Sequence, residues 1–181
     1  MHGLIFEEMK LFAETRLAAG AWQELLAAAG LEGRSFEISR SYPDEEIKRL
    51  LVAASKKTGL PVNAILESFG EFIAPHLLAL VPSLVKSEWR TLDVVEHTER
   101  TIHAVVRAQQ PGATPPYLRA HRTSPSEVIV FYDSPRKFCF IAKGIVNGLA
   151  QHFGETIRID EPRCMLDGAP DCTLLISVVQ N

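Results

Sequence analysis

A histidine, followed further along the chain by a tyrosine, a serine and an arginine at alternate positions, is the set of residues best suited to chemistry. His103 lies in a segment that reads as helix, and Tyr132, Ser134 and Arg136 come after a proline-rich stretch. In an extended backbone, positions i, i+2 and i+4 line one face, so we expect the three side chains to project together. A guanidinium can bind a carboxylate through two hydrogen bonds, and two hydroxyls can satisfy its remaining lone pairs. These four residues predict an imidazole ligand for a metal next to a binding site for carboxylates.

A haem needs both features, because its iron accepts an imidazole and its propionates are carboxylates. At these residues the sequence resembles the H-NOX family, haem nitric oxide/oxygen-binding domains related to the sensor domain of soluble guanylate cyclase. The family's hallmark is a proximal haem histidine followed by Tyr-x-Ser-x-Arg. The resemblance implies that His103 is the single protein ligand of haem b and that Tyr132, Ser134 and Arg136 hold the propionates. It also implies that Pro116 presses on the porphyrin, although a proline in a loop needs no such role.

The distal side of such a haem decides which gas binds. Bound O2 carries partial negative charge and is held by a hydrogen-bond donor, whereas NO and CO bind without one. Where O2-binding members of the family have a distal tyrosine, this chain has Ile141, and Ile145 nearby is also apolar. His76 is the nearest donor in sequence, and we expect it to point away. The other distal candidates are all apolar: Leu4, Ile5, Met9, Ala74 and Leu78. We therefore expect a sensor that binds NO, and also CO, but excludes O2.

The three cysteines form a second candidate site, at Cys139, Cys164 and Cys172. A structural zinc ion takes four nitrogen or sulfur ligands in a tetrahedron. A subset of bacterial H-NOX proteins is similar here, with three cysteines and a histidine, but this chain has Glu161 at the place of that histidine. Two interpretations stay open: a zinc site completed by Glu161, His152 or water, or buried or redox-sensing thiols without a metal.

The composition bounds the class of protein. The chain has 181 residues, 46% of them hydrophobic and 23% charged, which is typical of one globular domain with a sizeable core. A net charge of −3 offers no basic surface for nucleic acid. No apolar run is long enough to span a membrane, and the N-terminus lacks the pattern of a signal peptide. We therefore expect a cytoplasmic domain, with no nucleic-acid or membrane partner.

Hydrophobic periodicity predicts an α+β fold. Antiparallel strands are expected late in the chain, with one helix between them, and helices early. The resemblance implies a single domain over 1–181, with a distal helical lobe of about residues 1–65 and a proximal lobe of about residues 66–181 built of helices and antiparallel sheet. Helices are expected at 7–29 (one or two), 45–58, 62–80 (kinked or split by Pro75), 92–109 and 137–153, and strands at 117–124, 127–132, 156–160 and 172–179.

The resemblance also implies how such a domain signals. NO would bind ferrous haem opposite His103, weaken or break the iron–histidine bond, and shift the population of two lobe arrangements. The output would pass to a separate partner, either a histidine kinase or a cyclic-di-GMP enzyme. An enzyme is not expected, because there is no Cys–His pair at a recognised spacing and the apolar distal side lacks an acid–base group. The alternative is a zinc- or thiol-based redox interaction module in which haem is secondary.

Overall fold

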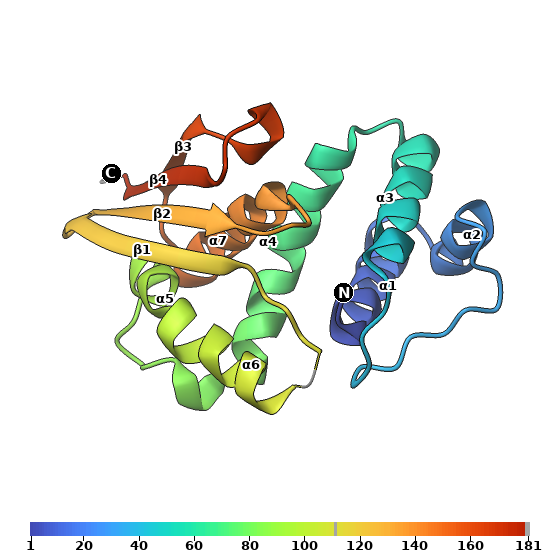
Figure 1. Cartoon of the computed structure of the whole chain (residues 1–181), viewed down its shortest axis with the longest axis horizontal. Coiled ribbons are helices and arrows are strands. Elements are labelled where there is room, and N and C mark those ends of the chain that lie inside the picture. The colour runs from blue at the N-terminus through green and yellow to red at the C-terminus, as the bar shows by residue number, and fades with distance from the viewer. Residues whose placement is uncertain (111, 180–181) are drawn as a thin grey trace.

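A helical N-terminal lobe stands beside a lobe built on a sheet, with one long helix between them (Figure 1). The computed structural model describes residues 1–110 and 112–179. None of the helices in this described part is both long and apolar enough to cross a membrane. The N-terminal lobe contains α1 (Gly3–Arg16), α2 (Ala21–Ala28) and α3 (Asp44–Thr58), and the helix between the lobes is α4 (Val62–Leu80).

The second lobe combines four antiparallel strands with helices, which confirms the α+β class. The strands lie in the order β1-β2-β4-β3, so the last strand of the chain is inserted between β2 and β3. The elements are η1 (Pro82–Leu84), α5 (Thr91–His97), η2 (Glu99–His103), α6 (Ala104–Gln109), β1 (Tyr117–Ser124), β2 (Glu127–Asp133), α7 (Cys139–Phe153), β3 (Ile157–Arg163), η3 (Met165–Asp167) and β4 (Cys172–Val178).

The N-terminal lobe has its own apolar core. On α3, apolar residues at helical spacing are buried, among them Ile47, Leu50 and Leu51, as its periodicity predicts. The Phe6 ring stacks on that of Phe36 with 4.0 Å between centroids, which ties α1 to the loop before α3. The first turn of α3 is acidic and its last turn is basic, an arrangement that complements the helix dipole.

Glycines let α4 and α7 pack backbone against backbone, side by side behind the sheet (Figure 1). A Cβ on Gly144 would lie 2.0 Å from the carbonyl oxygen of Glu67, and one on Gly148 would lie 2.5 Å from that of Glu71. On the facing helix, a Cβ on Gly70 would lie 2.4 Å from the carbonyl oxygen of Ile141. Only glycine permits such an approach, so these positions hold the two helices at a fixed separation.

Two expectations about helices need correction. Pro75 does not split α4, which is helical without interruption from Val62 to Leu80, because packing along α7 outweighs the loss of one backbone donor. A kink at Pro75 stays a prediction. The segment 92–109 is not a single α-helix, since a π-helical turn separates α5 from α6. In this turn the backbone N–H of His103 donates to the carbonyl of Thr98, five residues back, at 2.9 Å. The expected lobe division near residue 65 falls within the first turn of α4 and stays a prediction.

Candidate functional site

A cavity of about 540 Å³ lies where the two lobes meet. Its volume is in the range of small-molecule and cofactor sites. Helices α1, α4, α6 and α7, the turn η2, strands β1, β2 and β4, and the segments before and after the β1–β2 pair all contribute to its walls. Among the residues that line it are His103, Pro116, Tyr132, Ser134 and Arg136. The structure thus brings together residues that are far apart in the sequence.

His103 is presented to this cavity by the π-helical turn, a feature that is frequent at functional sites. Its side chain is only 14% exposed, and Nδ1 lies 3.0 Å from Oε2 of Glu99. Burial lowers the pKa of His103, and this outweighs the opposite effects of Glu99 and of the Pro116 carbonyl, which also accepts from the imidazole. A neutral imidazole whose Nδ1–H is donated to an acceptor keeps Nε2 for a metal.

The tyrosine, serine and arginine do not all lie in extended backbone, as the argument from their alternate spacing assumed. Strand β2 ends at Asp133, so Tyr132 is on the strand while Ser134 and Arg136 lie in the turn that follows. The turn nevertheless brings all three to the cavity wall. Tyr132 and Ser134 are buried, and burial raises the pKa of the Tyr132 phenol to about 12, despite a hydrogen bond with Ser134. The phenol therefore keeps its proton and can donate a hydrogen bond to a carboxylate.

Arg136 contacts both lobes. Its Nε donates to Oδ1 of Asp44 at 2.9 Å, and its Nη1 and Nη2 donate to the carbonyl and the hydroxyl of Thr114 at 2.7 and 2.6 Å. A guanidinium has five N–H donors, so two remain for a carboxylate ligand. Burial would raise the pKa of Asp44, but hydrogen bonds from the N-terminal ammonium of Met1 and from Arg136 bring it below its usual value. Asp44 and Thr114 were not foreseen from the sequence.

The wall formed by α1, α4 and α7 is apolar. Ile5, Leu78, Ile141 and Ile145 line it, as do Leu4 and Ala74. Met9 does not line the cavity as expected, because its turn of α1 is covered by the apolar side chains of the N-terminal core. His76 points to Glu8, with 2.7 Å between Nδ1 and Oε2, and is not among the lining residues either. His2 also lines the cavity, and no pattern in the sequence indicated it.

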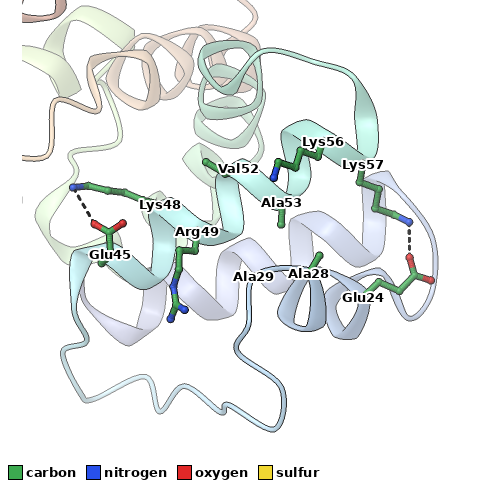
Figure 2. A pocket seen from close by; sticks show the side chains of 10 residues that line it. All are labelled: Glu24, Ala28, Ala29, Glu45, Lys48, Arg49, Val52, Ala53, Lys56 and Lys57. Atoms are coloured by element: carbon green, nitrogen blue, oxygen red, sulfur yellow. Dashed lines mark hydrogen bonds and ion pairs between the residues drawn. The ribbon is translucent and has the colours of Figure 1, made fainter.

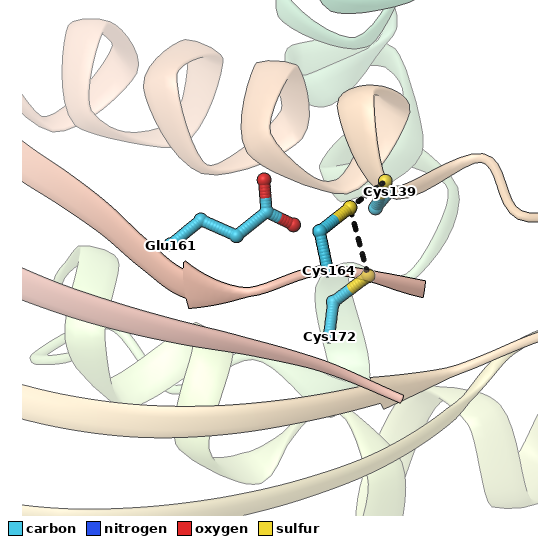
Figure 3. A group of neighbouring side chains, drawn as sticks. All are labelled: Cys139, Glu161, Cys164 and Cys172. Atoms are coloured by element: carbon cyan, nitrogen blue, oxygen red, sulfur yellow. Dashed lines mark hydrogen bonds between the residues drawn. The ribbon is translucent and has the colours of Figure 1, made fainter. Parts of the chain in front are cut away.

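The three cysteines converge at the end of α7 (Figure 3). The Sγ atom of Cys164 lies 3.8 Å from that of Cys139 and 3.7 Å from that of Cys172. A zinc ion with bonds of about 2.3 Å to a tetrahedron of sulfurs separates them by about 3.8 Å, so the spacing fits such an ion. All three thiols are buried, and burial raises the pKa of Cys139 to about 11 and that of Cys172 as well. Without a cation, Cys139 and Cys172 keep their protons at neutral pH.

Glu161 completes this group. Its carboxylate and the three sulfurs offer donor atoms that all lie within 4.8 Å of one another, the only such group of three or more metal-ligating residues in the part of the chain that the structure describes. One carboxylate oxygen accepts from Nζ of Lys143 at 2.6 Å, while the other, Oε1, is buried without a hydrogen-bond partner. Such an orphaned oxygen suits a cation. His152, the other expected fourth ligand, does not belong to the group.

A second hollow, of about 600 Å³, lies between α2 and α3 (Figure 2). Four of its six charged side chains form ion pairs: Lys48 lies 3.6 Å from Glu45, and Lys57 contacts Glu24. No histidine, cysteine or aromatic residue lines it, so it offers no ligand for a haem iron and no stacking surface for a porphyrin. The cavity between the lobes is therefore the candidate site.

Comparison with known proteins supports this choice. A family model described as Haem-NO-binding matches residues 2–161. An H-NOX protein from Shewanella oneidensis, solved in an Fe(II)NO ligation state, superposes with a TM-score of 0.92 at 25% identity over 99% of this chain and 100% of that one. An Fe(II)CO structure of an H-NOX domain from the same organism gives a TM-score of 0.89 at 25% identity over the whole of both chains.

Curated relatives are more distant. Soluble guanylate cyclases gcy-31 and gcy-35 of Caenorhabditis elegans are 20% and 23% identical over 86% of this chain. The chain spans only 22% and 23% of the length of these two relatives. The similarity therefore concerns one part of each cyclase.

Proposed function

This chain belongs to the Haem-NO-binding family, the H-NOX domains of haem-based gas sensors, and on that premise we propose that it senses nitric oxide selectively over O2. The observation that carries the proposal is that His103 lies largely buried in a cavity to which α1, α4 and α7 contribute only apolar side chains. A bound haem would supply a ferrous iron with one coordination position for His103 and an opposite one for a gas.

The residues of the cavity suit a haem. His103 offers a neutral imidazole, and Tyr132 and Ser134 offer hydroxyls for carboxylates at a buried edge. Arg136 has N–H donors left after its bonds to Asp44 and Thr114. Pro116 lies in the cavity wall, where the family precedent has a proline against the porphyrin. We propose these five residues as haem contacts, with Ile5, Leu78, Ile141 and Ile145 on the distal side.

Selectivity against O2 rests on the apolar wall. Of the described residues that α1, α4 and α7 contribute to the cavity, none carries a side-chain hydrogen-bond donor. Bound O2 would therefore lack a hydrogen-bond donor to stabilise its partial negative charge, whereas NO needs no such donor. We propose that the domain passes its signal to a separate histidine kinase or cyclic-di-GMP enzyme and is not itself an enzyme.

Absorption spectra of protein produced with ample haem test the proposal. We expect a Soret band that shifts when NO is added to the ferrous protein and no stable oxy complex in air. His103→Ala should lose the bound haem, while the control His152→Ala, outside the cavity, should keep it. A colourless protein that does not take up haem would refute the proposal, and a stable oxy complex would refute its selectivity.

A second candidate function is a zinc or thiol switch at the cysteine cluster, and the orphaned oxygen of Glu161 favours the zinc form. Three sulfurs and a carboxylate would provide four ligands, and zinc binding would displace the thiol protons. Metal analysis of purified protein is expected to find one zinc per chain, reduced in Cys164→Ser and Glu161→Gln. Thiols that react fully without release of zinc would instead support the metal-free interpretation.

A further inference from the structure

The partner of His103 is a carboxylate with an unusual number of donors around it. Glu99 is four residues before His103, and its side chain is 21% exposed. Oε2 accepts from Nδ1 of His103 at 3.0 Å and from the backbone N–H of Leu118 at 3.1 Å. Oε1 accepts from Nη2 of Arg107. Three N–H groups from three different segments thus converge on one carboxylate and hold it in place.

These contacts fix the direction in which Glu99 faces. The π-helical turn carries both Glu99 and His103, Arg107 lies one turn further along on α6, and Leu118 is on the edge strand β1. Both oxygens of the Glu99 carboxylate accept hydrogen bonds from N–H groups, which is the pattern of an ionised carboxylate. The imidazole also interacts with the carbonyl of Pro116, which is a neutral acceptor. Hydrogen bonds to an ionised acceptor are about twice as strong as those between neutral groups, so Glu99 is the stronger partner.

We propose that Glu99 is a positioning residue that makes His103 a strongly donating iron ligand and so resists cleavage of the iron–histidine bond. The inference rests on the proposed haem function and deepens it. A carboxylate that accepts from Nδ1–H draws the proton away from the ring, which raises the basicity of the other nitrogen and fixes the orientation of the imidazole. A neutral carbonyl in the same place does so less.

The consequence concerns the balance between two coordination states. A more basic Nε2 would hold the iron of a bound haem more tightly, so a larger fraction of the protein would keep His103 bound to it in the presence of NO. Removal of Glu99 takes the ionised acceptor away from Nδ1 and weakens that hold. Loss of a residue that hydrogen-bonds to a metal ligand typically lowers the metal affinity by about 10–100-fold.

Resonance Raman and absorption spectra of the haem-loaded protein test this inference. We compare Glu99→Gln and Glu99→Ala with the control Glu96→Gln, a carboxylate on α5 that pairs with Arg122 instead. Both Glu99 variants should show a lower iron–histidine stretching frequency, a larger five-coordinate fraction in the NO complex, and haem transfer to apomyoglobin faster by about 10–100-fold. Glu96→Gln should match the wild type. Glu99→Gln is nearly isosteric, so it remains informative if Glu99→Ala folds poorly.

The outcomes separate this inference from the proposed function. If the Glu99 variants bind haem and NO but keep the wild-type stretching frequency and coordination, the role of Glu99 is refuted while NO sensing stands. A general loss of stability would increase haem loss without a shift in the stretching frequency, and that result would also refute the role. A wild-type protein that takes up no haem would overturn both.

Discussion

Replacing Gly144 by alanine tests the packing that fixes the two helices behind the cavity. The added Cβ would lie 2.0 Å from the carbonyl oxygen of Glu67, about 1.4 Å closer than the 3.4 Å at which ordinary contact begins. The clash cannot be relieved by moving a flexible side chain, because the added Cβ meets the backbone of α4. The helices must therefore separate, and overpacking of this kind costs about 1–3 kcal/mol.

The expected shift in melting temperature follows from this cost. Alanine favours a helix over glycine by about 0.5–1 kcal/mol, which offsets part of the strain. A net loss on the order of 1–2 kcal/mol lowers the melting temperature of a domain of this size by roughly 2–8 °C. Because α4 and α7 both line the cavity, haem should also dissociate faster.

Thermal and denaturant unfolding provide the measurement. The matched control is Gln151→Ala, an exposed position on the same helix, which should change the free energy of unfolding by no more than about 0.5 kcal/mol. A Gly144→Ala protein as stable as the control would show that the two helices separate without cost. The account of their packing would then be wrong.

Three further predictions concern the cavity itself. Ile141→Tyr should create a stable oxy complex, because the phenol can donate a hydrogen bond to bound O2. A hydrogen bond to a charged group contributes about 1.5–3 kcal/mol, or roughly 10–150-fold in O2 affinity. Ile141→Phe is the control, and equal O2 binding by the two variants would contradict the argument that the apolar wall excludes O2. Arg136→Ala should lower the haem content of purified protein by removing donors to a carboxylate, whereas Arg40→Ala, on the surface, should not, and full occupancy in Arg136→Ala would exclude this role. The Tyr132 phenol should release its proton only near pH 12, whereas an ordinary phenol has a pKa of 10.0. Its contribution to the stability of the fold is therefore complete below pH 10 and is lost as the pH rises towards 12. A pH titration of phenolate absorbance should show a final step near pH 12 that is missing in Tyr132→Phe, and a step that persists in this variant would assign the high pKa to another residue.

The parts of the site that depend on local spacing could be predicted from the sequence. His103 and the Tyr-x-Ser-x-Arg pattern lie within one stretch of the chain, and the helical period of α3 and the alternation of β2 are read from neighbouring residues. Strand β2 ends at Asp133, one residue beyond the predicted range of 127–132, so Ser134 and Arg136 lie in the turn after it, yet their side chains reach the same cavity. The resemblance therefore identified residues that line one cavity, although they do not all lie in extended backbone, and their role in haem binding stays a prediction.

Contacts between distant segments could not be predicted. Asp44 and Arg136 are 92 positions apart, and nothing near either residue indicates the other. The close approach of α4 and α7 depends on glycines of both helices facing each other, whereas each glycine taken alone reads as a weak point in its helix. Met9 was misplaced for a related reason, since helical spacing places it with Ile5 but does not show where the core of the N-terminal lobe begins.

Glu99 lies between these two cases. On a helix, residues four positions apart are neighbours, so its proximity to His103 was visible in the sequence. A carboxylate in that place could equally have faced solvent, as most do. What directs it towards the imidazole is Arg107, further along the same helical segment, together with the Leu118 N–H from β1, and the contact with β1 depends on the tertiary fold. The sequence can therefore identify a ligand by its type and spacing, but the strength of that ligand is determined by which segments the fold brings behind it.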